Sequence, residues 1–152
     1  KAAPVEEQDW MGRGAGAGAR GADPVLAERV AQLQLRRDAL ADLSFAARRG
    51  TLEGYALAAE VGRFVSLQGD ALCSDVKGVL EMQKGQPGSD RARTMARRVV
   101  LGVDALRVRA GQQAPLAGLD DRTTGTIVAL EETLDALDGL LKLLPEGRRS
   151  FL

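Results

Sequence analysis

The spacing of large apolar residues near the C-terminus constrains the fold of this sequence more than any other feature. Over residues 120–144 they recur in alternating steps of three and four, at Ile127, Leu130, Leu134, Leu137, Leu141 and Leu144. Such steps bring side chains onto one face of an α-helix. Pro145 and Gly147 then end the helix. This regularity favours packing at a shallow angle against antiparallel neighbours.

A first helix is expected over residues 24–49. Asp23 can cap its N-terminus, and Pro24 suits the first helical position because proline lacks the N–H that would be unpaired there. Gly50 ends the helix, since glycine readily adopts the left-handed conformation that closes a last turn.

Two more helices are expected between these. The first of them covers 52–84, with Thr51 as its cap and a bend near Gly69. The turn "GQPGS" follows, and Ser89 is expected to cap the next helix, over 90–110.

No strand pattern competes with these helices, and aromatic residues make up only 3% of the chain. The sequence therefore predicts an all-α fold, an antiparallel up-down-up-down four-helix bundle over residues 23–147. An extended N-terminal arm rich in glycine and alanine precedes it over 1–22, and a C-terminal tail follows over 148–152.

The stretch "GRGAGAGARGADP", residues 12–24, is unusual in its glycine content. Gly16, Gly18 and Gly21 fit the pattern G-x-G-x-x-G, which cradles a pyrophosphate when a buried strand leads into it. The residues before it are too acidic for such a strand, so nucleotide binding is not expected. A flexible tail is the default interpretation, because ordering glycine costs backbone entropy and alanine offers little burial in return. The other interpretation is a docking arm that lies along a partner protein, through Val5, Trp10, Met11, Arg13 and Arg20.

The composition offers little catalytic chemistry. The chain has no histidine, which is the commonest general base and metal ligand, and its single Cys73 is expected to be a small buried residue. Asp135 and Asp138 lie one helical turn apart, but they are expected to be solvated carboxylates. No catalytic, cofactor-binding or metal-binding residue is predicted. No apolar run is long enough to span a membrane.

Charge gives a weaker indication. Lys plus Arg equals Asp plus Glu at 21 each, which provides no argument for nucleic acid or an anionic membrane as partner. Several arginines nevertheless occur in adjacent pairs. They are interpreted either as a docking surface for an acidic partner or as solvated faces balanced by nearby acids. The pairs assigned to docking are Arg48-Arg49 and Arg97-Arg98.

The order and lengths of the four helices resemble those of the PsbQ family, the extrinsic lumenal subunits of photosystem II. The resemblance covers the first helix with its basic end "ARRGTL", the turn "MQKGQPGSD" between the second and third helices, and the closing helix "TIVALEETLDALDGLLKLL". Plant members carry a tryptophan near Leu52 and a tyrosine near Thr126, and are basic and proline-rich at the N-terminus. The departures here favour an algal, red-lineage type.

The resemblance implies a non-catalytic subunit of the oxygen-evolving complex in the chloroplast thylakoid lumen, peripheral to the membrane. It would dock on the photosystem II core and other extrinsic subunits, and would help to retain calcium and chloride without ligating them. No nucleic acid, small-molecule substrate or bound cofactor is implied. The alternative is a periplasmic helical-bundle sensory or adaptor domain of a bacterial receptor. The sequence upstream of Lys1 would discriminate, since a bipartite transit peptide fits the first function and an uncleaved membrane span the second.

Overall fold

The computed structural model describes residues 24–111 and 119–144, with side chains in the second range from Thr124 onward. The predicted arm over 1–22 lies outside the described residues, and so does the predicted tail over 148–152. The proposed docking residues of the arm, Val5, Trp10, Met11, Arg13 and Arg20, are therefore not placed by the structure.

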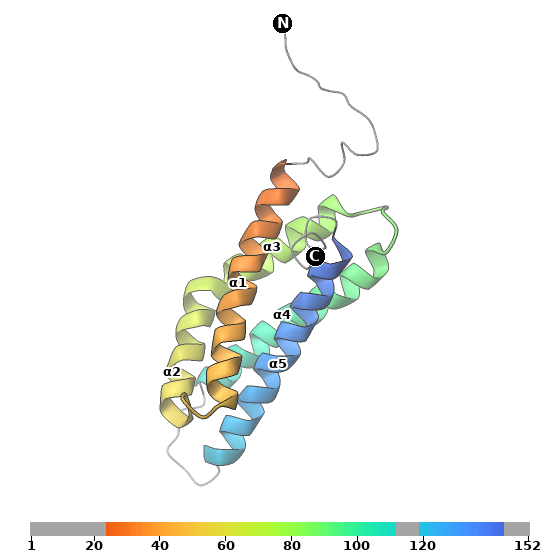
Figure 1. Cartoon of the computed structure of the whole chain (residues 1–152). Coiled ribbons are helices and arrows are strands. Elements are labelled where there is room, and N and C mark those ends of the chain that lie inside the picture. The colour runs from red at the N-terminus through yellow and green to blue at the C-terminus, as the bar shows by residue number, and fades with distance from the viewer. Residues whose placement is uncertain (1–23, 112–118, 145–152) are drawn as a thin grey trace, which may run out of the picture.

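All regular secondary structure in the described chain is helical, which confirms the predicted all-α class (Figure 1). The predicted helix 24–49 is α1 (Pro24–Arg48), and 52–84 corresponds to the continuous run of α2 (Gly54–Phe64), η3 (Val65–Gly69) and α3 (Asp70–Met82). The predicted helices 90–110 and 120–144 are α4 (Ser89–Gly111) and α5 (Leu119–Leu143). No strand occurs within 24–111 or 119–144.

A π-helical turn, η3, joins α2 to α3 where the sequence predicts a bend. Figure 1 shows the chain changing direction between these two helices. Gly69 is buried here because it lies close to α4, and a Cβ atom at this position would stand 3.3 Å from Val103 Cγ1. The buried apolar residues on either side are Leu57, Val61 and Phe64 of α2, Val65 of η3, and Leu72, Val76 and Val79 of α3.

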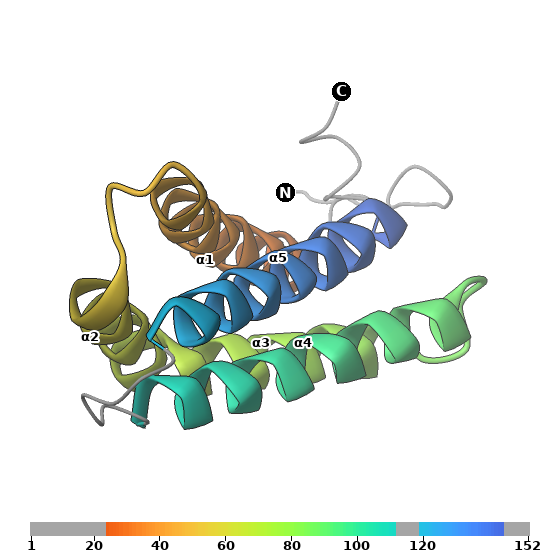
Figure 2. The same cartoon turned by 90° about the horizontal axis from the view of Figure 1, so that it is seen from below.

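The helices form two layers, with α1 and α5 in one and α2, α3 and α4 in the other (Figure 2). The most extensive packing joins α4 to α5, and α1 packs on α5 and α3. Within the described ranges, no helix combines the length and apolar character needed to cross a membrane.

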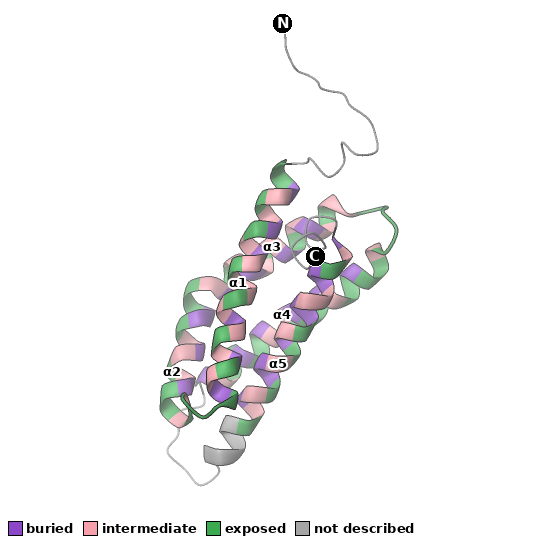
Figure 3. Cartoon of the chain, in the orientation of Figure 1, coloured by how far each residue is buried: buried purple, intermediate pink, exposed green. Residues whose placement is uncertain are grey.

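The core is built from leucine, valine and alanine side chains on the facing sides of these helices (Figure 3). On α5, Leu130, Leu137 and Leu141 are fully buried as predicted, whereas Ile127 and Leu134 are only partly buried. Phe64 is the one aromatic residue in the described core. The interior is therefore held together by aliphatic packing.

Two predicted caps are wrong. Thr51 does not begin α2, because its hydroxyl donates to the Ala46 carbonyl at 3.0 Å and so helps to close α1 after Gly50, whose φ is 80°. Ser89 is the first residue of α4. The residue that precedes the helix is Gly88, whose carbonyl accepts the N–H of Ala92 at 3.0 Å.

Candidate docking surface

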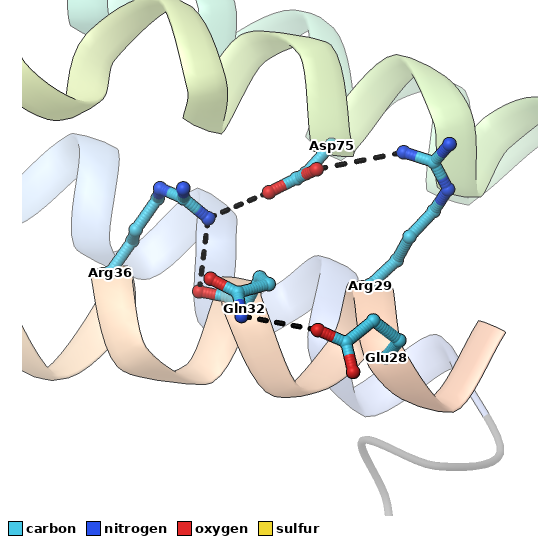
Figure 4. A network of polar contacts seen from close by, with 5 residues as sticks. All are labelled: Glu28, Arg29, Gln32, Arg36 and Asp75. Carbon is cyan, nitrogen blue, oxygen red and sulfur yellow. Dashed lines mark hydrogen bonds and ion pairs between the residues drawn. The ribbon is translucent and has the colours of Figure 1, made fainter. Parts of the chain in front are cut away.

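Two arginines of α1 share one carboxylate of α3 (Figure 4). Arg36 Nη1 donates to Asp75 Oδ2 at 2.6 Å, and Arg29 Nη1 lies 3.5 Å from Asp75 Oδ1. The side chains of Arg36 and Asp75 are only 16% and 18% exposed. Gly78 leaves the room that the Arg29 guanidinium occupies, since a Cβ there would collide with it. This cluster fixes α1 against α3.

Two further arginines join α1 to α5. Arg37 Nε and Nη2 donate to Asp138 at 2.7 and 3.3 Å, and the hydrogen bond with this carboxylate raises the pKa of Arg37. Arg48 forms a similar fork with Glu131, at 3.0 and 2.6 Å, which raises the pKa of Arg48. Arg49 stacks over the Phe45 ring at 4.7 Å. The predicted docking residues Arg48 and Arg49 thus have contacts within the bundle.

The other predicted pair, Arg97 and Arg98, lies exposed on α4. Neither forms an ion pair with any residue that the structure describes, whereas Arg93 on the same helix lies 3.4 Å from Asp90. The two side chains line different surface hollows. Arg97 lines a hollow between α3 and α4, and Arg98 lines a hollow between α4 and α5. The helix α4 thus separates two surface hollows.

The hollow between α3 and α4, here called the α3–α4 slot, has a volume of about 240 Å³. Its floor is apolar, formed by Val76, Leu80, Ala96 and Val100, and its rim carries three cations, Lys77, Arg93 and Arg97. An apolar floor beneath positive charge suits an apolar side chain that is flanked by carboxylates. The slot thus combines an apolar floor with a positively charged rim.

The hollow between α4 and α5, here called the α4–α5 groove, is larger, at about 720 Å³. The helices approach closely because residue 102 is glycine, and a Cβ at this position would collide with the Thr133 side chain. The groove floor consists mainly of small residues: Gly102, Ala105, Ala129, Thr133, Ala136 and Gly139. Small side chains thus line most of this groove.

A third hollow, of about 460 Å³, lies beside η3 and is crossed by an ion pair of 3.2 Å between Arg107 and Asp70. Cys73 is half-buried on the next turn of α3. Burial raises the pKa of its thiol, and the negative charge of Asp104 raises it further. A raised pKa keeps the thiol protonated and weakly nucleophilic.

The carboxylates do not assemble into a metal site in the described part of the chain, where no three side chains of the ligating types come together. Asp138 binds Arg37, whereas its predicted neighbour Asp135 lines the α4–α5 groove. The two acids thus serve different contacts.

Sequence reasoning missed Lys77, which belongs to the slot because α3 and α4 lie side by side. The signal available was its position next to Val76 on the buried face of α3, since long cationic side chains extend past an apolar face to water. Comparison with models of protein families, with curated proteins and with solved structures finds no match to this chain.

Proposed function

We propose that this chain is a non-catalytic docking subunit, an extrinsic protein of photosystem II on the lumenal face of the thylakoid membrane. In this proposal the bundle has antiparallel up-down-up-down order and carries an extended arm, as the resemblance to the PsbQ family implies. The subunit binds other proteins and leaves the ligation of calcium and chloride to them. It stabilises the water-oxidising site and helps to retain calcium and chloride there.

The observation that supports docking best is the α3–α4 slot. Lys77 and Arg97 are exposed at its rim, and no described carboxylate forms an ion pair with either. Unpaired cations beside apolar side chains are typical of surfaces that bind acidic proteins, because the charge steers the encounter and the apolar floor supplies affinity. Arg91, also exposed on α4, adds to the positive potential.

The experiment is rebinding to photosystem II membranes from which the extrinsic subunits have been washed away. We expect Arg97→Glu and Lys77→Glu each to weaken binding at least about tenfold, equivalent to about 1.4 kcal/mol. Raising the salt concentration should weaken wild-type binding as well, since exposed charges are screened. Circular dichroism of each variant checks that the bundle remains helical.

Arg63→Glu is the matched control. Arg63 is an exposed arginine on α2 with an ion pair of 3.3 Å to Glu60, and it lies outside the slot. It should rebind like wild type. Equal binding of all three variants and wild type would contradict docking through the slot. A chain that does not bind these membranes at all would contradict the photosystem assignment and favour the sensory-domain alternative.

The arm is tested in the same assay. Trp10 is its expected anchor, because tryptophan is enriched among the residues that dominate binding energy. Deleting residues 1–20, or changing Trp10→Ala alone, should weaken rebinding and leave the thermal melting of the bundle unchanged. A deletion that lowers the melting temperature would show that the arm packs on its own bundle.

A further inference from the structure

The α4–α5 groove lies beside an exposed apolar ridge on α4. Leu101 and Val108 are 60% and 59% exposed, and they are seven residues apart, so they project from the same side of the helix. Leu101 itself lines the groove. Exposed large side chains next to a channel floored by glycine and alanine form a knob and a hole on the same face.

The two walls of this groove carry opposite charges. Arg98 lies on the α4 wall, and Glu132 and Asp135 lie on the α5 wall. Within the described residues no ion pair joins Arg98 to Glu132 or Asp135, although all three side chains are exposed. A groove with one basic and one acidic wall is complementary to a copy of itself when the two-fold axis runs along the groove, because this rotation brings the basic wall of each copy onto the acidic wall of the other.

We infer that the α4–α5 groove binds a second copy of this chain, forming a two-fold dimer in which the α4 ridge of each protomer enters the groove of its partner. Leu101 then lies near the two-fold axis, against the small residues that line the partner's groove. Arg98 of each protomer faces Glu132 and Asp135 on the other. This inference does not depend on the proposed function, since neither Lys77 nor Arg97 contributes to it.

Sedimentation equilibrium of the full chain over a range of concentrations tests the dimer. The apolar ridge is short, so we expect a dissociation constant in the range of about 1–100 μM. Leu101→Glu should leave a monomer. Arg98→Glu and Glu132→Arg should each weaken the dimer at least about tenfold, and combining them should restore it, because the swapped charges again face each other.

Leu67→Glu is the matched control, since Leu67 is 73% exposed on η3 and lies outside the groove. It should dimerise like wild type. Oxidative crosslinking gives a second measurement. In a Cys73→Ala background, Leu101→Cys should form a disulfide-linked dimer readily, whereas Leu67→Cys should not.

Three results would overturn the inference. The chain could remain monomeric at every concentration, or form a dimer that Leu101→Glu leaves intact, which would place self-association on another face. A monomer that dimerises only after deletion of residues 1–23 would show that the chain's own arm fills the groove. The two proposals can fail separately. A chain that rebinds to membranes but does not dimerise contradicts only this inference, and a chain that dimerises but does not rebind contradicts only the proposed function.

Discussion

The helices α1 and α4 carry the same Arg-Arg dipeptide in two different environments. On α1, Arg36 reaches Asp75 of α3, and Arg37 reaches Asp138 of α5. On α4, Arg97 and Arg98 also face α3 and α5, and neither forms an ion pair with a described residue. One pair joins three helices of the bundle, and the other remains exposed to solvent.

The difference lies in what α3 and α5 present to each neighbour. Towards α1 they present carboxylates that form ion pairs with its arginines. Towards α4, α3 presents Val76 and Leu80, and α5 presents Ala129 and Ala136. The α5 acids that line the same groove, Glu132 and Asp135, form no ion pair with Arg98 in the described part of the chain. An arginine pair thus joins neighbouring helices or stays exposed, according to the helix opposite it. The dipeptide itself carries no information about which role it has.

The largest effect expected within this comparison is that of Asp75→Ala. The change leaves the mostly buried Arg36 without its carboxylate, and the Nε atom of this arginine is already buried without a partner. We expect a loss of about 1–3 kcal/mol in the free energy of unfolding, measured with urea. Asp42→Ala, an exposed aspartate on α1, is the control. A loss no larger than that of the control would mean that the α1 cluster contributes nothing to stability.

A smaller loss, about 0.5–1.5 kcal/mol, is expected for Arg37→Gln, because this pair is more exposed. Asp138 raises the pKa of Arg37. A cation whose pKa is raised on folding contributes stability that is complete below its unfolded pKa and is lost as the pH rises through the folded pKa. Both values are strongly alkaline, so the difference from wild type should stay constant between about pH 6 and 9. Urea unfolding of wild type and Arg37→Gln at several pH values across this range measures the difference. If the difference disappeared within the range, the stabilising ion pair between Arg37 and Asp138 would be refuted.

The smallest effect on stability is expected for α4. Arg97→Gln and Arg98→Gln should each change the free energy of unfolding by less than about 0.5 kcal/mol, since exposed side chains without partners contribute little. The same urea titration measures this. If the free energy of unfolding fell as much in either variant as in Arg37→Gln, a carboxylate of this chain would have to form an ion pair with that arginine of α4. The contrast between α1 and α4 would then disappear.

The helices could be predicted from the sequence because their signals are local. The apolar steps on α5 place Leu130, Leu137 and Leu141 in the core, and Gly50 ends α1 as predicted. The prediction that Thr51 caps the second helix was wrong, because a hydroxyl at a helix junction can bond to either neighbouring helix. Here it donates to a carbonyl of the preceding helix, α1. Local signals thus locate a helix more reliably than its cap.

The division of the arginines could not be predicted in this way. Arg37 and Asp138 are far apart in sequence, and their contact follows from how α1 packs on α5. The groove was missed for a similar reason. In the sequence, Gly102 indicates only a locally weaker helix, because glycine has a low helix propensity. The close approach of α4 and α5 that it allows is evident only from the packing of Thr133 against it.

Between α2 and α3 the chain holds one residue more than an uninterrupted α-helix needs. Leu57 and Phe64 share the buried face at a seven-residue spacing, and so do Val65 and Leu72, so the buried face advances by one position at η3. Losing one exposed residue of η3 would merge α2 and α3 into a single helix in which Leu57 and Phe64 share one face with Leu72, Val76 and Val79. A deletion within α4 or α5 would instead turn the rest of that helix by about 100° and take its apolar face out of the core. Among these helical segments, a one-residue deletion should therefore be tolerated best at η3.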